Sequence, residues 1–370
     1  MKFVVIKSNI RDAIMATQRA SGENTNLPIL KNTLIKAEDN TITLNTTNLE
    51  IAITAGVSGK IIENGQVSIP TNLLSNLIGN IQSDRINFEK KGSNLEVKTD
   101  NYQATIQGLP SEEFPLTPKI TDTEHYLEIK GVLFKEAIQQ VMIASQFSDL
   151  RPELNSILFN FSIENTKLTA TDGFRLAEKT IPASSFTAKF PEPFKILIPL
   201  KTAQEISRIV SDSATVKIFK DENQILFVTE KIHLISRLSE GNFPEYSSII
   251  PKSFTTETTV NREEFMNAVK LASVFSEKHH ELKIGVHPQK KAIEVSAADQ
   301  SFGENSYLLP AKIKGESTEV ILNAKYLADA IKNIGGEDLF LGLQEDANPA
   351  LIKSFNDSSY FYILKPILKA

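Results

Sequence analysis

The residues of this 370-residue chain that could do chemistry are few, and its five histidines come first. His279 and His280 are adjacent and His287 follows, so these three could in principle ligate a metal ion. Adjacent histidines in a polar stretch are more often solvated, and we therefore expect no metal site. The absence of cysteine excludes disulfides, thiolate nucleophiles and cysteine-ligated zinc, and it fits a reducing cytosol.

A second candidate for chemistry is Asp172 with Gly173, which could hold a catalytic aspartate in a tight turn. The alternative is a hairpin turn in which Gly173 takes a positive φ, and these residue types favour it. The sequence contains no phosphate loop of the G-x-x-x-x-G-K-S/T type and no G-x-G-x-x-G fingerprint. The sequence therefore predicts no catalytic site and no cofactor.

Basic side chains are the third candidate, because positive residues along helices could contact phosphate groups. Five of the six expected helices carry one or two of them, namely Arg11, Arg19, Lys135, Lys201, Arg208, Arg262, Lys270, Lys325 and Lys332. Acidic residues such as Asp12, Glu205 and Asp329 lie among them, so ordinary solvated helix faces would look the same. The formal net charge of −5 means that the whole molecule would be repelled by nucleic acid. Binding to DNA would require the positive residues to gather on one surface.

The elements that position these residues are repeated three times along the chain, with a period of about 125 residues. An alternating strand that ends in a polar turn recurs at residues 42–48, 168–173 and 293–299. A strand that runs into a helix recurs at residues 67–70, 196–199 and 320–323. The first two copies close alike, at residues 109–115 and 238–244. Three copies of one domain favour a scaffold whose geometry is the function, because one catalytic pocket does not need triplication.

Each copy is expected to contain two amphipathic helices. The first helix should begin after Ser8 in copy one and after Asn261 in copy three, where Glu264 completes a capping-box pattern. The second helices should begin near Thr71, Lys201 and Asn323. The expected fold class is α+β, with three tandem domains that each pack two helices on antiparallel sheets.

We expect the domains to span residues 1–120, 126–250 and 253–370, with short linkers at 116–125 and 250–257. Hydrophobic residues make up 41% of the chain and no low-complexity tract occurs, which is typical of an ordered globular protein. The apolar run near the N-terminus is too short for a signal peptide or a membrane span. We therefore expect a cytoplasmic protein that does not bind membranes.

Several separated motifs resemble the β subunit family of bacterial DNA polymerase III, the sliding clamps. The motifs lie at residues 27–32, 47–50, 170–177 and 241–246, and the similarity runs from Met1 to Pro366. The resemblance implies a head-to-tail homodimer whose six domains close a ring around duplex DNA, with the helices lining the hole. It implies a non-enzymatic processivity factor in which positive residues face the DNA without reading its sequence. The alternative is a tandem-repeat scaffold whose partners are proteins only.

The resemblance also implies a cleft between the second and third domains for a short linear motif. Its partners would be the polymerase III α subunit, the clamp loader, other polymerases and repair proteins. The matching residues are Leu154, Thr171, Gly173, Phe174, Arg175, Leu176, Pro244, Ile249, Ile363, Lys365, Pro366 and Ile367. Phe174 stands where a histidine is common in the family, and Lys365 stands where an apolar residue is common.

Two further sets of residues follow from the resemblance. Ring closure should join the first domain of one subunit to the third domain of the other, through the strand at 102–109 with Leu109 and through Val274 and Phe275. Phe275 could instead be a core residue of its own helix. Asn24 replaces a basic residue found in relatives, and Arg151, within a shortened stretch at 147–154, would keep part of the DNA contact.

Overall fold

The computed structural model describes residues 1–22, 26–148, 150–276, 280–301, 303–344 and 348–368. It divides the chain into two compact units. Unit 1 contains residues 1–135, 186–191 and 205–238, and unit 2 contains residues 136–185, 192–204 and 239–370. No helix among the described residues is both long enough and apolar enough to cross a membrane.

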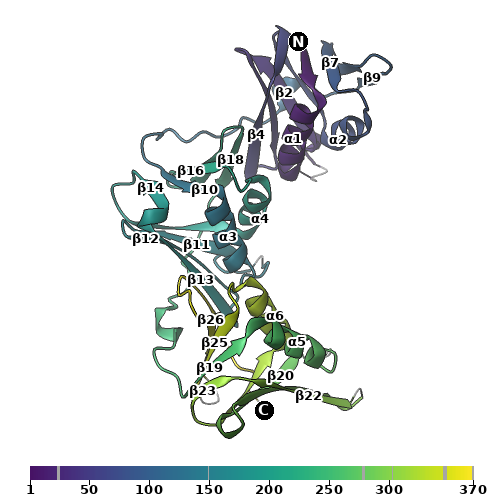
Figure 1. Cartoon of the computed structure of the whole chain (residues 1–370). Coiled ribbons are helices and arrows are strands. Elements are labelled where there is room, and N and C mark those ends of the chain that lie inside the picture. The colour runs from purple at the N-terminus through teal and green to yellow at the C-terminus, as the bar shows by residue number, and fades with distance from the viewer. Residues whose placement is uncertain (23–25, 149, 277–279, 302, 345–347, 369–370) are drawn as a thin grey trace. The chain divides into compact units, whose positions relative to one another are not determined.

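Three tandem copies of one arrangement make up the fold, and all six expected helices are present (Figure 1). Each copy opens with a strand that runs into a helix: β1 (Lys2–Ile6) and α1 (Lys7–Thr17), β10 (Leu127–Lys130) and α3 (Gly131–Met142), β19 (Thr256–Asn261) and α5 (Arg262–Ser273). The second strand–helix pairs are β6 (Gly65–Pro70) with α2 (Thr71–Asn80), β15 (Phe194–Pro199) with α4 (Leu200–Ile209), and β24 (Thr318–Asn323) with α6 (Ala324–Asn333). The repeat seen in the sequence is therefore a repeat in the fold.

The first helix begins two residues earlier than predicted, whereas the predicted start of the fifth helix is confirmed. Ser8 lies inside α1, because β1 pairs with its neighbour as far as Ile6 and the N–H of Lys7 donates to the carbonyl of Asp84 at 2.7 Å. At α5, the side chain of Asn261 accepts a hydrogen bond from the N–H of Glu264 at 3.0 Å. The first N–H of α5 is bonded in the same way, from Arg262 to the carbonyl of Glu337 at 2.8 Å, so the Asn261 side chain satisfies a further N–H of that helix.

Two nine-stranded antiparallel sheets each continue from one expected domain into the next. In unit 1 the order is β14 (Phe186–Ala188), β10, β16 (Thr215–Lys220), β17 (Gln224–Val228), β18 (Ile232–Arg237), β4 (Ile51–Val57), β3 (Thr41–Thr47), β2 (Asn32–Glu38) and β6. In unit 2 the order is β15, β11 (Ser156–Phe161), β12 (Asn165–Thr171), β13 (Arg175–Pro182), β27 (Tyr360–Leu364), β26 (Ala350–Ser354), β25 (Asp338–Leu343), β19 and β23 (Lys312–Gly315). This shared pairing explains why the two units do not follow the expected domain bounds.

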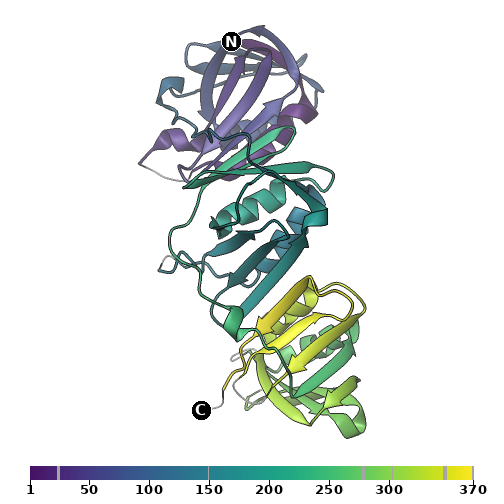
Figure 2. The same cartoon turned by 90° about the vertical axis from the view of Figure 1, so that its left-hand side faces the viewer.

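We call the place where the first and second domains share a sheet the first junction, and the place where the second and third domains share a sheet the second junction. The strand pairs that join the domains at these two junctions have the same register. At the first junction β18 pairs with β4, and Ser236 lies opposite Ile51. At the second junction β27 pairs with β13, and Leu364 lies opposite Arg175. In Figure 2 the second pairing is visible where the yellow strands run beside the teal ones. Each junction is therefore a backbone ladder rather than a flexible linker.

Two smaller sheets complete the ends of the chain. One has the order β5 (Gly59–Glu63), β1, β7 (Arg85–Lys91), β8 (Asn94–Lys98) and β9 (Gln103–Ile106), and the other has the order β22 (Gly303–Pro310), β21 (Ala292–Asp299), β20 (Glu281–His287) and β24. In the first domain α1 lies beside α2, and both bury an apolar stripe against the two sheets (Figure 1). The stacked rings of Phe3 and Phe88, 4.9 Å apart, lie in the same core as Ile10 and Leu74. Full burial of such a side chain contributes about 2 kcal/mol, so this core fixes the helices on the sheets.

Candidate functional site at the second junction

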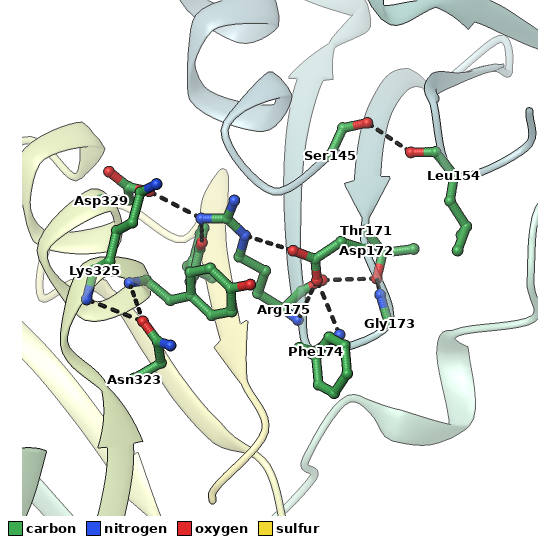
Figure 3. A network of polar contacts seen from close by, with 12 residues as sticks. Ser145, Leu154, Thr171, Asp172, Gly173, Phe174, Arg175, Asn323, Lys325 and Asp329 are labelled. Carbon is green, nitrogen blue, oxygen red and sulfur yellow. Dashed lines mark hydrogen bonds and ion pairs between the residues drawn. The ribbon is translucent and has the colours of Figure 1, made fainter. Parts of the chain in front are cut away.

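The turn between β12 and β13 is closed by its own side chains (Figure 3). The Asp172 carboxylate accepts hydrogen bonds from the N–H groups of Phe174 at 2.9 Å and Arg175 at 3.0 Å. The Thr171 hydroxyl accepts from the N–H of Gly173 at 3.1 Å and donates to the carbonyl of Arg175 at 2.7 Å. Gly173 has a φ of +89°, which confirms the predicted turn. Asp172 therefore shapes the turn, and its Oδ1 is fully used in doing so.

Arg175 holds three segments of unit 2 together. Its Nε donates to Asp172 Oδ2 at 2.9 Å, and its Nη1 donates to Asp329 Oδ2 at 2.9 Å and to the Tyr362 hydroxyl at 3.3 Å. The guanidinium carbon also lies 4.0 Å from the ring centre of Tyr326. Figure 3 shows the guanidinium between Asp172 on the turn and Asp329 on α6.

The Arg175 side chain is only 10% exposed, so it does not stand at the rim as a free cation. Burial by itself lowers the pKa of Arg175, but the hydroxyl of Tyr362 and the carboxylate of Asp172 outweigh it and raise the pKa above its ordinary value. Burial has the opposite effect on Tyr362, whose pKa it raises, so the Tyr362 hydroxyl stays protonated at neutral pH. Arg175 is therefore a permanently charged positioning residue, and its planar fork suits two carboxylates at once.

The C-terminal segment lies beside the turn because two backbone hydrogen bonds hold it there. The N–H of Lys365 donates to the carbonyl of Phe174 at 2.8 Å, and the N–H of Ile367 donates to the carbonyl of Ile321 at 2.8 Å. Pro366 is buried, whereas the Lys365 side chain is exposed. The tail thus continues the β27 ladder past the end of the strand.

A third segment, residues 243–249, is tied to the same sheet. The hydroxyl of Tyr246 donates to Glu178 Oε2 at 2.6 Å and lies 3.1 Å from the Thr169 hydroxyl. The ring of Phe243 packs edge-on against Tyr246, with centroids 6.0 Å apart. The short 3₁₀ turn η5 (Ser247–Ile249) follows and leaves Ile249 44% exposed.

The residues expected in the peptide cleft divide into an exposed set and a supporting set. Phe174 is 61% exposed, and Pro244 and Ile249 are also exposed. Leu154, Leu176 and Ile363 are at most 7% exposed, and the carbonyl of Leu154 accepts a hydrogen bond from the Ser145 hydroxyl at 2.6 Å (Figure 3). A ligand on this surface would meet the exposed apolar side chains, while the buried ones hold the backbone beneath them.

The basic residues expected to face DNA are unequally available. Exposed members are Arg11, Arg151, Lys201, Arg208, Lys270, Lys325 and Lys332. Arg19 and Arg208 lie 3.3 Å and 3.1 Å from the carboxylate of Glu205, and Lys135 lies 2.9 Å from Asp212. The last member, Arg262, is half-buried. Part of the positive charge is thus neutralised locally.

The residues expected at the subunit interface also differ in availability. Val274 is 60% exposed just after α5, while Phe275 is half-buried and its N–H donates to the carbonyl of Ala272 at 3.0 Å. Leu109 lies past the end of the edge strand β9, and its N–H donates to the carbonyl of Ser68 at 3.0 Å. Leu109 also packs on a buried cluster within its own domain, so Val274 is the most accessible of the three.

A cavity of about 490 Å³ lies in unit 1 between the α2 region and the turn that leads from β8 into the edge strand β9. Its lining includes Leu73, Leu77 and Ile81 of the α2 region and Tyr102 before the strand. Leu73 is 49% exposed and Tyr102 is 46% exposed. The sequence predicted the strand at 102–109 as part of the subunit interface but not the α2 side chains. Leu73 and Leu77 belong to an apolar helix stripe, and such a stripe is typical of residues that pack in a domain core.

Two groups of residues around the site were missed or cannot be placed. The sequence did not predict that Asp329, Tyr326 and Tyr362 contact Arg175, because they lie more than 150 residues away along the chain and only the fold brings them together.

Among the described residues no group of three His, Asp or Glu could hold a metal ion. Asn24, Asp149 and His279 lie outside the described residues, so the expectations that involve them remain predictions.

Comparisons with known proteins agree along the whole chain. Family models described as the N-terminal, central and C-terminal domains of the DNA polymerase III beta subunit match residues 1–118, 128–245 and 247–367. The beta sliding clamp of Bacillus subtilis is 26% identical, and that of Synechococcus elongatus is 22% identical, with 99% of each chain covered. The crystal structure of the DNA polymerase sliding clamp from Bacillus subtilis superposes with a TM-score of 0.94 at 25% identity, covering 100% of both chains. A Pseudomonas aeruginosa sliding clamp bound to griselimycin shares the fold, with a TM-score of 0.94 at 21% identity over 100% of both chains. Three family domains matched in order over almost the entire sequence show that this chain belongs to the DNA polymerase III beta subunit family, the beta sliding clamps.

Proposed function

We propose that this protein is a DNA sliding clamp, a non-catalytic homodimeric ring that encircles duplex DNA and tethers the replicative polymerase. The observation that carries the proposal is the match of all three clamp domains in order along the chain. The domain bounds that we propose are 1–120, 126–250 and 253–370. The protein would act in the cytoplasm, where the chromosome is copied.

The contact with DNA is expected to be weak and independent of sequence. Seven of the ten proposed DNA-facing residues have exposed side chains, and the acidic neighbours of Arg11 and Arg208 reduce the local positive charge. Phosphate attraction without base contacts lets a protein slide, and its strength falls steeply with salt. Lasting attachment would therefore depend on closure of the ring rather than on tight binding.

Closure of the ring would use two apolar surfaces of the chain. The cavity lined by Leu73, Leu77 and Tyr102 adjoins the start of β9, an edge strand to which a strand of another chain can add. Leu271 and Val274, at the end of α5, are 44% and 60% exposed and would supply the complementary side chains. A head-to-tail contact between these two surfaces, made twice, closes a dimer.

The second junction would bind the short linear motif of the polymerase III α subunit, the clamp loader, and other polymerases and repair proteins. The exposed Phe174, Pro244 and Ile249 provide an apolar surface, and the hydrogen-bonded turn and tail keep its backbone rigid. Peptide recognition commonly combines apolar anchors with such a preorganised frame.

The test is loading by a clamp loader onto nicked circular duplex DNA, followed by cutting of the circle. We expect the protein to stay on the circle in salt that abolishes simple electrostatic binding, and to leave once the DNA is linear. Equal retention on circular and linear DNA would contradict encirclement. A protein that never associates with either form would instead favour the alternative, a scaffold for protein partners only.

A further inference from the structure

A second cavity lies at the first junction, entirely within unit 1, and no part of the proposed function uses it. Its volume is about 590 Å³. Strands β2, β3, β4, β6, β17 and β18 contribute to its lining, as does the segment between Ser111 and Ile120. Its apolar wall is formed by Leu34, Ala52, Phe114, Ile120, Leu226 and Ile235. A cavity of this size is large enough for a small ligand or for several side chains of a peptide.

The backbone at this junction repeats that of the second junction. The Thr47 hydroxyl accepts from the N–H of Leu49 at 3.0 Å and donates to the carbonyl of Ile51 at 3.0 Å. The Asn48 side chain accepts from the N–H groups of Glu50 at 3.0 Å and Ile51 at 2.8 Å. This is the hydrogen-bond pattern of the turn at residues 171–175, and Leu49 has the positive φ, +77°, that the glycine has there.

The strand that follows is held against each turn in the same way. The N–H of Arg237 donates to the carbonyl of Glu50 at 3.0 Å, as the N–H of Lys365 donates to the carbonyl of Phe174. Because the sheet registers agree, Ile235 opposite Ala52 corresponds to Ile363 opposite Leu176.

The covering segment is also equivalent, and the matching side chains line the cavity. Pro115 is followed five residues later by Ile120, and Pro244 is followed five residues later by Ile249. Four cavity residues, Ala52, Pro115, Ile120 and Ile235, thus occupy the positions of Leu176, Pro244, Ile249 and Ile363. The first junction therefore has the same backbone arrangement as the second junction, but different side chains line it.

The charges that line the cavity favour an anionic ligand. Lys36 and Lys119 contribute to the lining and form no ion pair among the described residues, while Glu112 is the only acidic lining residue. Glu112 is already hydrogen-bonded by the Ser111 hydroxyl at 3.0 Å. Partial burial lowers the pKa of His233, so this imidazole is neutral at pH 7 and the lysines carry the positive charge. On a chain with a net charge of −5 this local excess of positive charge is notable.

We propose that the cavity at the first junction is a second peptide-binding site, which takes a short segment that combines apolar side chains with a carboxylate. The apolar wall would hold the apolar side chains, and Lys36 or Lys119 would pair with the carboxylate. The choice of a peptide over another anionic amphiphile rests on the proposed function of the second junction, because both junctions share one backbone frame. Ile120 is only 7% exposed whereas Ile249 is 44% exposed, so the first site is more closed and should bind more weakly.

The test reads both sites at once, in the full-length protein labelled with ¹³C at its isoleucine methyl groups. The probe is the tetrapeptide acetyl-Gly-Asp-Leu-Leu-amide, and the control peptide has asparagine in place of aspartate. We expect the methyl signals of Ile120 and Ile235 to shift on titration with the probe. The dissociation constant from the same signals should be at least about tenfold higher for the control peptide. The signals of Ile249 and Ile367 report the second junction independently.

A charge-reversed variant separates the two sites. Lys36→Glu with Lys119→Glu should weaken the response of Ile120 and Ile235 by about tenfold and leave that of Ile249 and Ile367 unchanged. Lys31→Glu with Lys231→Glu changes the net charge equally at exposed positions outside the cavity lining and should alter neither response. Lys119→Glu alone, at an exposed position, repeats the test if the double variant unfolds.

The possible outcomes are distinguishable. Shifts confined to Ile249 and Ile367 would overturn the second site and leave the proposed function intact. Shifts confined to Ile120 and Ile235 would support it and contradict peptide binding at the second junction. A response of Ile120 and Ile235 to decanoate but not to the probe would show a site for anionic amphiphiles and would also overturn the proposal.

Discussion

At the scale of single residues, Arg175 decides the geometry of the second junction. Its guanidinium pairs with Asp172, whose side chain is 2% exposed, and with Asp329, whose side chain is 34% exposed. Removal of one partner from such a buried pair is costly, because the remaining charge stays desolvated. Arg175 thus affects a ligand through the shape of the turn that carries Phe174.

We predict that Arg175→Ala destabilises the protein by about 3 kcal/mol and weakens a polymerase-derived peptide by about tenfold or more. Urea denaturation measures the first effect and fluorescence anisotropy of a labelled peptide measures the second. Arg175→Lys keeps the charge but loses the planar fork, so its effects should be intermediate. Unchanged titration curves for Arg175→Ala would show that the turn does not shape the binding surface.

Leu49 and Gly173 occupy equivalent turn positions with φ values of +77° and +89°. A leucine in this conformation is strained, because its Cβ approaches the backbone, whereas glycine is not. We predict that Leu49→Gly stabilises the protein by up to about 1 kcal/mol and that Gly173→Leu destabilises it by about as much. Among the described residues no atom lies within 4 Å of an added Cβ at Gly173, so Gly173→Ala, which adds only that atom, should isolate the cost of the backbone conformation. Thermal denaturation measures the change in Tm for each variant. Changes of opposite sign for Leu49→Gly and Gly173→Leu would verify the equivalence of the two turns, and changes of the same sign would refute it.

At the scale of elements, the C-terminal tail acts as an extension of β27. Two backbone hydrogen bonds, from Lys365 to Phe174 and from Ile367 to Ile321, hold it beside the turn. We predict that deletion of residues 365–370 weakens a polymerase-derived peptide by about tenfold, because the carbonyl of Phe174 loses its partner and the turn loosens. Lys365→Ala is the matched control, since it keeps the backbone bond and removes only an exposed side chain. A truncated protein that binds the peptide as tightly as the full chain would exclude this role.

The elements were largely predictable from local pattern, whereas their long-range contacts were not. Helix starts at Thr71 and Asn261 follow from periodicity and capping residues, which are encoded within a few positions. The predicted cap at Ser8 was wrong because β1 pairs with β7 as far as Ile6, and the helix begins directly afterwards at Lys7. The contact of Arg175 with Asp329 joins segments far apart in sequence, and no local rule specifies it.

At the scale of the whole molecule, the same junction occurs twice in one chain with different side chains. Arg175 at the second junction corresponds in register to Ile51 at the first, so the buried ion network is present at only one of them. The repeat fixes the backbone, and the side chains then decide what each junction binds. The sequence repeats predicted three copies of one domain, but the equal strand registers at the two junctions are visible only in the structure.

The assembly of the ring is tested most directly at Val274, which is 60% exposed within one chain. If this residue meets Leu73, Leu77 and Ile81 in the cavity of a second chain, Val274→Glu places a carboxylate against apolar side chains that cannot pair with it. We predict that the variant folds normally but dissociates at micromolar concentration, with a mass near 41.1 kDa rather than twice that value. Light scattering after size-exclusion chromatography measures the mass. Ile163→Glu, at a position that is 68% exposed and outside the proposed interface, should remain dimeric. A Val274→Glu protein that keeps the doubled mass would place the subunit contact elsewhere, because a charge of this kind cannot remain buried without a partner.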